Sequence, residues 1–279
     1  MNTKLYLICF LIIFCFSSCF IKPLKNTEDN TKAVFQKNAM KSDWLIKTFT
    51  HARVLSPGKL YSVQITEDSL DKTQMFRFEL RKDEQWIDIT KERSFRSEID
   101  VQDKPALKSE KWYRFSLMLP DNFPIEDNRL VLAQWHGRDK WWLGEKNRSP
   151  ALAFRFRNGV FRITLLHSDE RIVKEVDNVP SENLYKTKEF PLNKWNVFVV
   201  NVKWSYKTDG SVNIWWNNRQ IVKYSGSVGY NDNAGPYFQF GIYRDSTSKT
   251  YISYMKDIEL GDCAADIHFK IDPIEPVGK

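Results

Sequence analysis

Short stretches of alternating apolar and polar residues follow one another from about residue 46 to residue 260, without a long amphipathic helix. Such alternation is typical of half-buried β-strands. Turn pairs separate several stretches, and Asn158-Gly159 between two of them predicts a β-hairpin. The alternating stretches are residues 75–80, 112–119, 151–156, 160–165, 195–204, 211–216, 220–222 and 251–260. We therefore expect an all-β fold: a concanavalin-like β-jelly-roll sandwich of two antiparallel sheets with a concave groove.

The first residues have the pattern of an export signal. Lys4 precedes an apolar run over residues 5–16, and Ser17-Ser18-Cys19 follows. The run is too short to span a bilayer comfortably. Small residues before Cys19 resemble a bacterial lipoprotein cleavage box, although an ordinary signal peptide with an incidental cysteine is the alternative. We predict a lipoprotein signal peptide over 1–19, a polar tether over 20–45 and one jelly-roll domain over 46–279.

The composition of the chain limits the classes of binding partner that we expect. The formal net charge of +7 favours an anionic partner, and ten Trp residues exceed what a core of this size needs. A lipid-anchored, exported protein without a dispersed basic stripe fits an anionic polysaccharide better than nucleic acid. We expect a bacterial monomer in the periplasm or outer membrane that touches the membrane only through its anchor. No Cys/His spacing indicates a metal site.

Three expected strands place polar side chains on one face, because residues i and i+2 of a strand point the same way. Gln134 and His136 interrupt an apolar strand that begins at Leu130, and polar side chains there need a reason. Residues 96–100 and 237–244 likewise place polar side chains on one face of an expected strand. The predicted catalytic residues are Arg96, Gln134, His136 and Tyr243. Glu98, Tyr237, Gln239 and Arg244 are predicted to contact the substrate.

These residue types suit β-elimination on an O4-linked uronic acid. The C5 proton is weakly acidic while the neighbouring carboxylate is charged, so Gln134 and Arg96 would neutralise that carboxylate. His136 can act as a neutral base. Tyr243 can protonate O4, or act as the base if a cation such as Arg96 or Arg244 stabilises its phenolate. The chemistry requires no metal, and it leaves open whether His136 or Tyr243 takes the C5 proton.

The same segments resemble a known family. Residues 132–137 and 237–244 look like matching segments of the heparin lyase I family, and 96–98, 149–154 and 77–80 match in kind and order. The likeness covers about residues 45–260 and extends to jelly-roll alginate lyases. It implies a carbon–oxygen lyase that cleaves heparin-like or heparan sulfate-like glycosaminoglycan to 4,5-unsaturated products. It also implies His136 as base, Tyr243 as acid or second base, Gln64 as a further substrate contact, and calcium as the one cofactor to consider.

Two departures from the family bear on the substrate. Gln239 stands where the family has a lysine, and the segment between Gly137 and Ser149 is short where the family carries a long insertion. Both argue against heparin itself, and the alternative substrate is another polyuronate, glucuronan or alginate. Within and beside the short segment, Trp135, Arg138, Lys140 and Arg148 are predicted to contact the substrate.

Two rival functions stay open. Glu98-Ile99-Asp100 resembles the start of the Glu-x-Asp-x-Glu motif of laminarinase-like hydrolases. Gln102 stands in place of the last glutamate of that motif, and Asp103 belongs to the other face of the strand. A non-catalytic glycan-binding lipoprotein could instead use Trp135, Trp141 and Trp142 for stacking on sugar rings.

Overall fold

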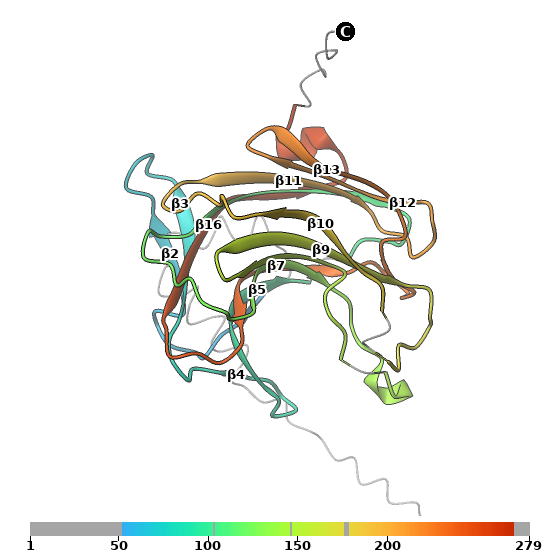
Figure 1. The fold of residues 1–279 in the computed structure, drawn as a ribbon, viewed down its shortest axis with the longest axis horizontal. Helices are drawn as coiled ribbons and strands as arrows, with labels where there is room; N and C mark the ends of the chain where they lie inside the picture. Colours follow the sequence, from blue (N-terminus) through green and yellow to red (C-terminus); the bar gives the residue numbers. More distant parts are fainter. Residues whose placement is uncertain (1–51, 103, 146, 176–178, 271–279) are drawn as a thin grey trace, which may run out of the picture.

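Two β-sheets lie face to face in the computed structural model, which describes residues 52–270 except 103, 146 and 176–178 (Figure 1). The larger sheet has the order β1 (Ala52–Leu55), β5 (Arg93–Val101), β15 (Tyr237–Arg244), β7 (Leu130–His136), β8 (Leu152–Arg157), β9 (Val160–Ser168), β10 (Ser181–Thr187), with β4 (Trp86–Ile87) on β5 and β14 (Gly229–Tyr230) on β9. The smaller sheet has the order β13 (Arg219–Gly226), β12 (Gly210–Trp216), β11 (Asn196–Lys203), β6 (Glu110–Met118), β16 (Tyr251–Gly261), β3 (Gln74–Leu80), β2 (Val63–Glu67).

The predicted jelly-roll sandwich is confirmed. Every strand pair along the two sheet paths is antiparallel, and among the described strands only the short β14 pairs in parallel, with β9. The turn at Asn158-Gly159 joins β8 to β9, and both turn residues have positive φ, 50° and 72°. No α-helix occurs among the described residues, which contain the 3-10 turns η1 (Trp141–Leu143) and η3 (Ala264–Ile267).

Aromatic side chains fill the space between the sheets. Phe115 of β6 and Phe198 of β11 meet Phe154 of β8, with ring centroids 5.5 Å and 5.0 Å apart. All three are fully buried. Because side chains alternate along a strand, the polar residues between these aromatics point away from the core. On the larger sheet they face its hollow side, where the β4–β5 hairpin and the η1 loop project beyond the sheet (Figure 1).

Gly241 shapes the middle of β15. Its φ is +135°, and a Cβ there would lie 2.4 Å from the carbonyl oxygen of Ser97 on β5. Only glycine accepts both this backbone conformation and this close approach. The register of β15 against β7 shifts between Phe240 and Tyr243, next to this glycine. The shift sets the direction in which Tyr243 leaves the sheet.

Several predictions cannot be judged on this part of the chain. The signal peptide, Cys19, the tether and the first residues of the predicted domain lie outside the described residues. Monomeric state and export likewise stay predictions. Among the described residues no helix is both long and apolar enough to cross a membrane.

Candidate active site

A cavity of about 430 Å³ opens on the hollow side of the larger sheet. The four predicted catalytic residues all line it: Arg96 from β5, Gln134 and His136 from β7, and Tyr243 from β15. Tyr237 and Gln239 line it as well. The structure therefore brings these six side chains together in one cavity, and their catalytic and binding roles stay predictions.

The strand register explains the convergence. β15 lies between β5 and β7 and pairs with both. Tyr243 lies opposite Arg96, Gln239 lies opposite Gln134, and Tyr237 lies opposite His136. Residues directly opposite one another on the same face are close enough for their side chains to interact. Three segments that are far apart in the sequence thus form one polar surface.

The cavity is rich in positive charge. Its charged lining consists of Arg96, Arg129, Arg148, Arg155, Glu92 and Asp139. Asp139 is already engaged, since the Arg148 guanidinium donates to its carboxylate at 3.3 Å. A cleft with an excess of guanidinium groups attracts an anionic ligand.

His136 is held at both ring nitrogens. Nδ1 lies 2.6 Å from the carbonyl oxygen of Gly137, and Nε2 lies 3.0 Å from the carbonyl oxygen of Arg148. A neutral imidazole has one N–H and can donate to only one of these carbonyls. Burial lowers the pKa of His136, which favours the neutral form. The ring must therefore turn away from one carbonyl before it can accept a proton from a ligand.

Tyr243 is partly exposed, like Tyr237 in the same cavity. The guanidinium of Arg96 lies 4.5 Å from the centre of its ring, and that of Arg129 lies 5.0 Å away. Arg129 also donates a long hydrogen bond, 3.4 Å, to the phenol oxygen. Negative charge that develops on this oxygen would lie next to two cations.

Glu98 lies beneath the cavity floor and does not line it. It is fully buried, and Gln134 Nε2 donates to its Oε1 at 2.7 Å. Arg96 Nη1 lies 3.7 Å from Oε2, which accepts no hydrogen bond from the described residues. Burial raises the pKa of Glu98 to about 7, against the opposing effects of Arg96 and Gln134. Glu98 thus orients the Gln134 amide and does not contact a ligand itself, contrary to the prediction.

Three further predicted contacts are wrong. Trp135 is fully buried in the core, 4.9 Å from the ring of Phe238, because it alternates with Gln134 and His136. Arg244 alternates with Tyr243 in the same way and is 1% exposed. Gln64 belongs to β2 in the smaller sheet, where it accepts a hydrogen bond from Arg77, so it lies in the other sheet from the cavity.

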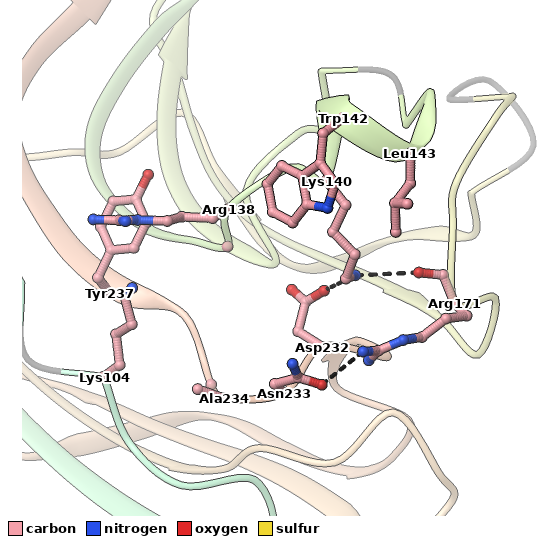
Figure 2. Close-up of a pocket in the computed structure, with 12 residues that line it drawn as sticks. Lys104, Arg138, Lys140, Trp142, Leu143, Arg171, Asp232, Asn233, Ala234 and Tyr237 are labelled. Carbon is pink, nitrogen blue, oxygen red and sulfur yellow. Dashed lines mark hydrogen bonds and ion pairs between the residues drawn. The ribbon is translucent and has the colours of Figure 1, made fainter. Parts of the chain in front are cut away.

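Arg138 and Lys140 lie in a second cavity of about 390 Å³, which shares Tyr237 with the first. Figure 2 shows Arg138 and Tyr237 on one side of it and Lys140 on the other. Lys140 is 7% exposed and pairs with Asp232 at 2.5 Å, so its charge is already compensated. Arg148, 3% exposed, pairs with the same Asp232 at 2.8 Å. Lys140 and Arg148 therefore fix the segment around η1.

Two arginines of the first cavity were missed from the sequence. Arg155 shares the outward face of β8 with Ala153, between the buried Leu152, Phe154 and Phe156. Its alternation was visible in the sequence, so this residue could have been found. Arg129 precedes β7 in a segment without periodicity, and only its contacts with Tyr243 and Asp245 reveal its position.

The rival hydrolase requires two carboxylates beside the scissile bond. Glu98 and Asp100 are both fully buried, and Asp100 accepts hydrogen bonds from Arg53. Neither lines the cavity, so the motif noted in the sequence does not form a hydrolase site here. Among the described residues no group of three or more His, Cys, Asp or Glu could hold a metal ion. The calcium that the family resemblance implies stays a prediction.

Solved structures with the same fold include polysaccharide-cleaving enzymes. An endo-β-1,4-glucuronan lyase from the fungus Trichoderma reesei superposes with a TM-score of 0.60 at 15% identity, covering 74% of this chain and 88% of that one. The family 7 alginate lyase A1-II′ gives 0.52 at 15% identity, over 77% and 96%. A substrate complex of that alginate lyase, with one histidine replaced by asparagine and one tyrosine by phenylalanine, gives 0.51 at 13% identity over 76% and 93%.

No protein of curated function matches the sequence. The sequence profile of the family described as "Polysaccharide lyase" matches residues 40–259, which span the described sandwich from β1 through most of β16. Because the match covers well over half of the chain, this protein belongs to the Polysaccharide lyase family.

Proposed function

We propose that this chain cleaves a polyuronate, glucuronan or alginate, by β-elimination in the cavity of the larger sheet. The observation that carries the proposal is that Arg96, Gln134, His136 and Tyr243 line one cavity. A donor pair, an imidazole and a phenol supply the functions that elimination from a uronate requires.

The carboxylate of the substrate is the group to be neutralised first. Gln134 uses one amide N–H for Glu98, and its second N–H can donate to the substrate. Arg96 lies on the neighbouring strand β5, opposite Tyr243. Hydrogen bonds from both stabilise the negative charge that spreads onto the carboxylate when the C5 proton leaves. The C5–H electrons then form the C4–C5 double bond, the C4–O4 bond breaks, and O4 accepts a proton from a side chain of the site as it leaves.

Tyr243 is the group best placed for the proton transfers. Its phenol oxygen lies beside Arg129, and Arg96 covers its ring, so a phenolate there is stabilised. His136 is bonded at both nitrogens and must rotate before it can act. We therefore propose that Tyr243 removes the C5 proton. His136, on the substrate side of β7, is the second residue that carries a proton.

The choice among polyuronates rests on fold similarity and on the two sequence departures. The glucuronan lyase superposes with the highest TM-score among the structures described above. Gln239 removes a cation that the heparin lyase I resemblance would require, and Lys140 and Arg148 are engaged with Asp232. Heparin and heparan sulfate remain predicted substrates that no observation tests, and they belong in the same assay.

Elimination creates a conjugated double bond, so ultraviolet absorbance of the product tests the proposal. The purified protein is incubated with glucuronan, alginate, heparin, heparan sulfate and hyaluronan. Rising absorbance with glucuronan or alginate supports the proposal. Reducing ends without absorbance would indicate a hydrolase, and binding without either product would indicate a glycan-binding protein.

Two variants test the assigned residues, each with a matched control on the smaller-sheet side of the molecule. Tyr243→Phe and His136→Ala should each lower kcat by about 100-fold or more, the range for loss of an acid–base group. Tyr254→Phe and His268→Ala should retain the parent rate, because Tyr254 belongs to β16 and His268 follows η3. A fully active His136→Ala enzyme would refute the role of His136.

A further inference from the structure

A single row of residues crosses the larger sheet from β5 to β10. Each member lies opposite the next on the neighbouring strand, so their side chains share the hollow face. The row consists of Arg96, Tyr243, Val131, Arg155, Arg162 and Lys186. The first half of the row belongs to the proposed active site, and the second half has no assigned role.

The second half combines cations that have no counter-ion among the described residues. Arg155 and Arg162 lie directly opposite one another on β8 and β9. Like charges in such positions destabilise a sheet. Arg155 donates to the hydroxyl of Thr164 at 2.9 Å, and no described carboxylate pairs with it. The Nε of Arg162 is buried, and none of the described residues accepts a hydrogen bond from it.

Neighbouring arginines show the contrast. Arg129 pairs with Asp245 at 2.6 Å, and Arg157 pairs with Asp127 at 2.6 Å. Burial and the nearby charge of Arg129 lower the pKa of Arg155 to about 10. Both arginines are partly exposed, so a ligand can reach their guanidinium groups. Arg155 and Arg162 have no carboxylate partner among the described residues, and they lie directly opposite one another, so together they offer an anion two adjacent guanidinium groups.

These arginines line a hollow that continues the active-site cavity. A cavity of about 170 Å³ is bounded by Arg155, Arg157, Arg162 and Arg129, among others. Arg129 and Arg155 also line the main cavity, so the two are adjacent. Strands lie about 4.8 Å apart, which is close to the length of one sugar unit. A chain laid across the strands thus advances by about one sugar at each strand.

We propose that Arg155 and Arg162 bind the carboxylates of uronate units that follow the cleaved unit toward β9, so that the enzyme selects substrates with consecutive uronates. This inference rests on the proposed function. In glucuronan and alginate every unit carries a carboxylate. In hyaluronan every second unit does, so one of the two guanidinium groups would stay unpaired.

The test compares Arg155→Gln and Arg162→Gln with the parent protein and with Arg219→Gln, an exposed arginine of β13 in the smaller sheet. Initial rates are measured on glucuronan oligomers of increasing length and on hyaluronan. We expect Arg155→Gln to raise KM for long oligomers about tenfold, equivalent to about 1.4 kcal/mol, with kcat changed by less than about threefold. The increase should disappear for the shortest oligomers that are cleaved, and Arg219→Gln should match the parent.

Thermal unfolding separates a ligand site from a structural role. Removing one cation of an unpaired like-charge pair should leave the Tm of Arg155→Gln equal to or above that of the parent. An unchanged KM for all lengths in an active parent enzyme, or a lowered Tm with kcat and KM both impaired, would overturn the inference. If the parent protein eliminates no polyuronate, the proposed function fails. Calorimetric binding of glucuronan oligomers then decides the inference: weaker binding by Arg155→Gln supports it, and no binding by the parent overturns it.

Discussion

Replacing Glu98 by glutamine should stabilise the folded protein, and the gain should depend on pH. Glu98 is fully buried, and burial is the main cause that raises its pKa from 4.5 to about 7. Below pH 4.5 the carboxyl group is protonated in both the folded and the unfolded chain, and its ionisation costs nothing. Between pH 4.5 and 7 the unfolded chain ionises first, so the parent protein loses stability as the pH rises. Above pH 7 the loss is complete.

The size of the effect follows from the pKa difference. Each pKa unit is worth about 1.4 kcal/mol, so the shift of Glu98 to about 7 corresponds to about 3 kcal/mol. Glutamine keeps an oxygen that can accept the hydrogen bond from Gln134 but carries no charge. The advantage of Glu98→Gln over the parent should therefore grow by about 3 kcal/mol from pH 4.5 to pH 7 and then stay constant.

Urea unfolding at a series of pH values measures this difference. Burial lowers the pKa of His136, so this residue has the opposite effect: it lowers the stability of the folded protein as the pH falls. The comparison between the two proteins cancels that contribution and isolates Glu98. Parallel stability curves for parent and variant across pH 4.5–7 would refute the burial argument. Glu98→Ala, which removes the acceptor for Gln134, should lower kcat/KM more than Glu98→Gln does.

Three further predictions address the site and the fold. Because burial lowers the pKa of His136, the acid limb of the kcat/KM profile should lie below pH 6.5, and a limb above that value would contradict a neutral, buried imidazole. Trp135→Ala should cost about 3–5 kcal/mol in urea unfolding, because its ring is buried in the core, whereas Trp142→Ala, at 62% exposure, should cost less than about 0.5 kcal/mol. Gly241→Ala should destabilise the fold by at least about 2 kcal/mol, measured in the same way, since its Cβ would meet the Ser97 carbonyl at 2.4 Å; an unchanged midpoint would show that β15 can move away.

Much of the fold and the centre of the site could be predicted because both depend on period-two alternation. The hairpin at Asn158-Gly159 could be predicted because an Asn-Gly pair between two alternating stretches is a strong signal for a β-hairpin turn. Gln134 and His136 could be placed on one face because the strand that holds them is long and otherwise apolar. The same rule also excludes Trp135 and Arg244 from the cavity, since each is one residue from a cavity-lining neighbour. Residue type alone predicts both as substrate contacts, and strand parity excludes them.

Other features depend on the order of strands in space, which local patterns do not encode. Gln64 has the alternation of any strand residue, and nothing nearby in the sequence shows that β2 belongs to the smaller sheet. Glu98 shares a face with Arg96 but sinks beneath the floor, because β15 passes so close to β5 at Gly241. The depth of a side chain below a surface is set by such contacts between distant segments.

The charges of the larger sheet show why stability and binding oppose one another in this fold. Arg155 and Arg162 face each other without a described counter-ion. A fold selected for stability alone would pair these charges or replace them with apolar residues. An anionic chain laid across the strands would supply the missing counter-charges when it binds. The arginines should therefore gain most from ligand binding at the positions where they cost the free protein most.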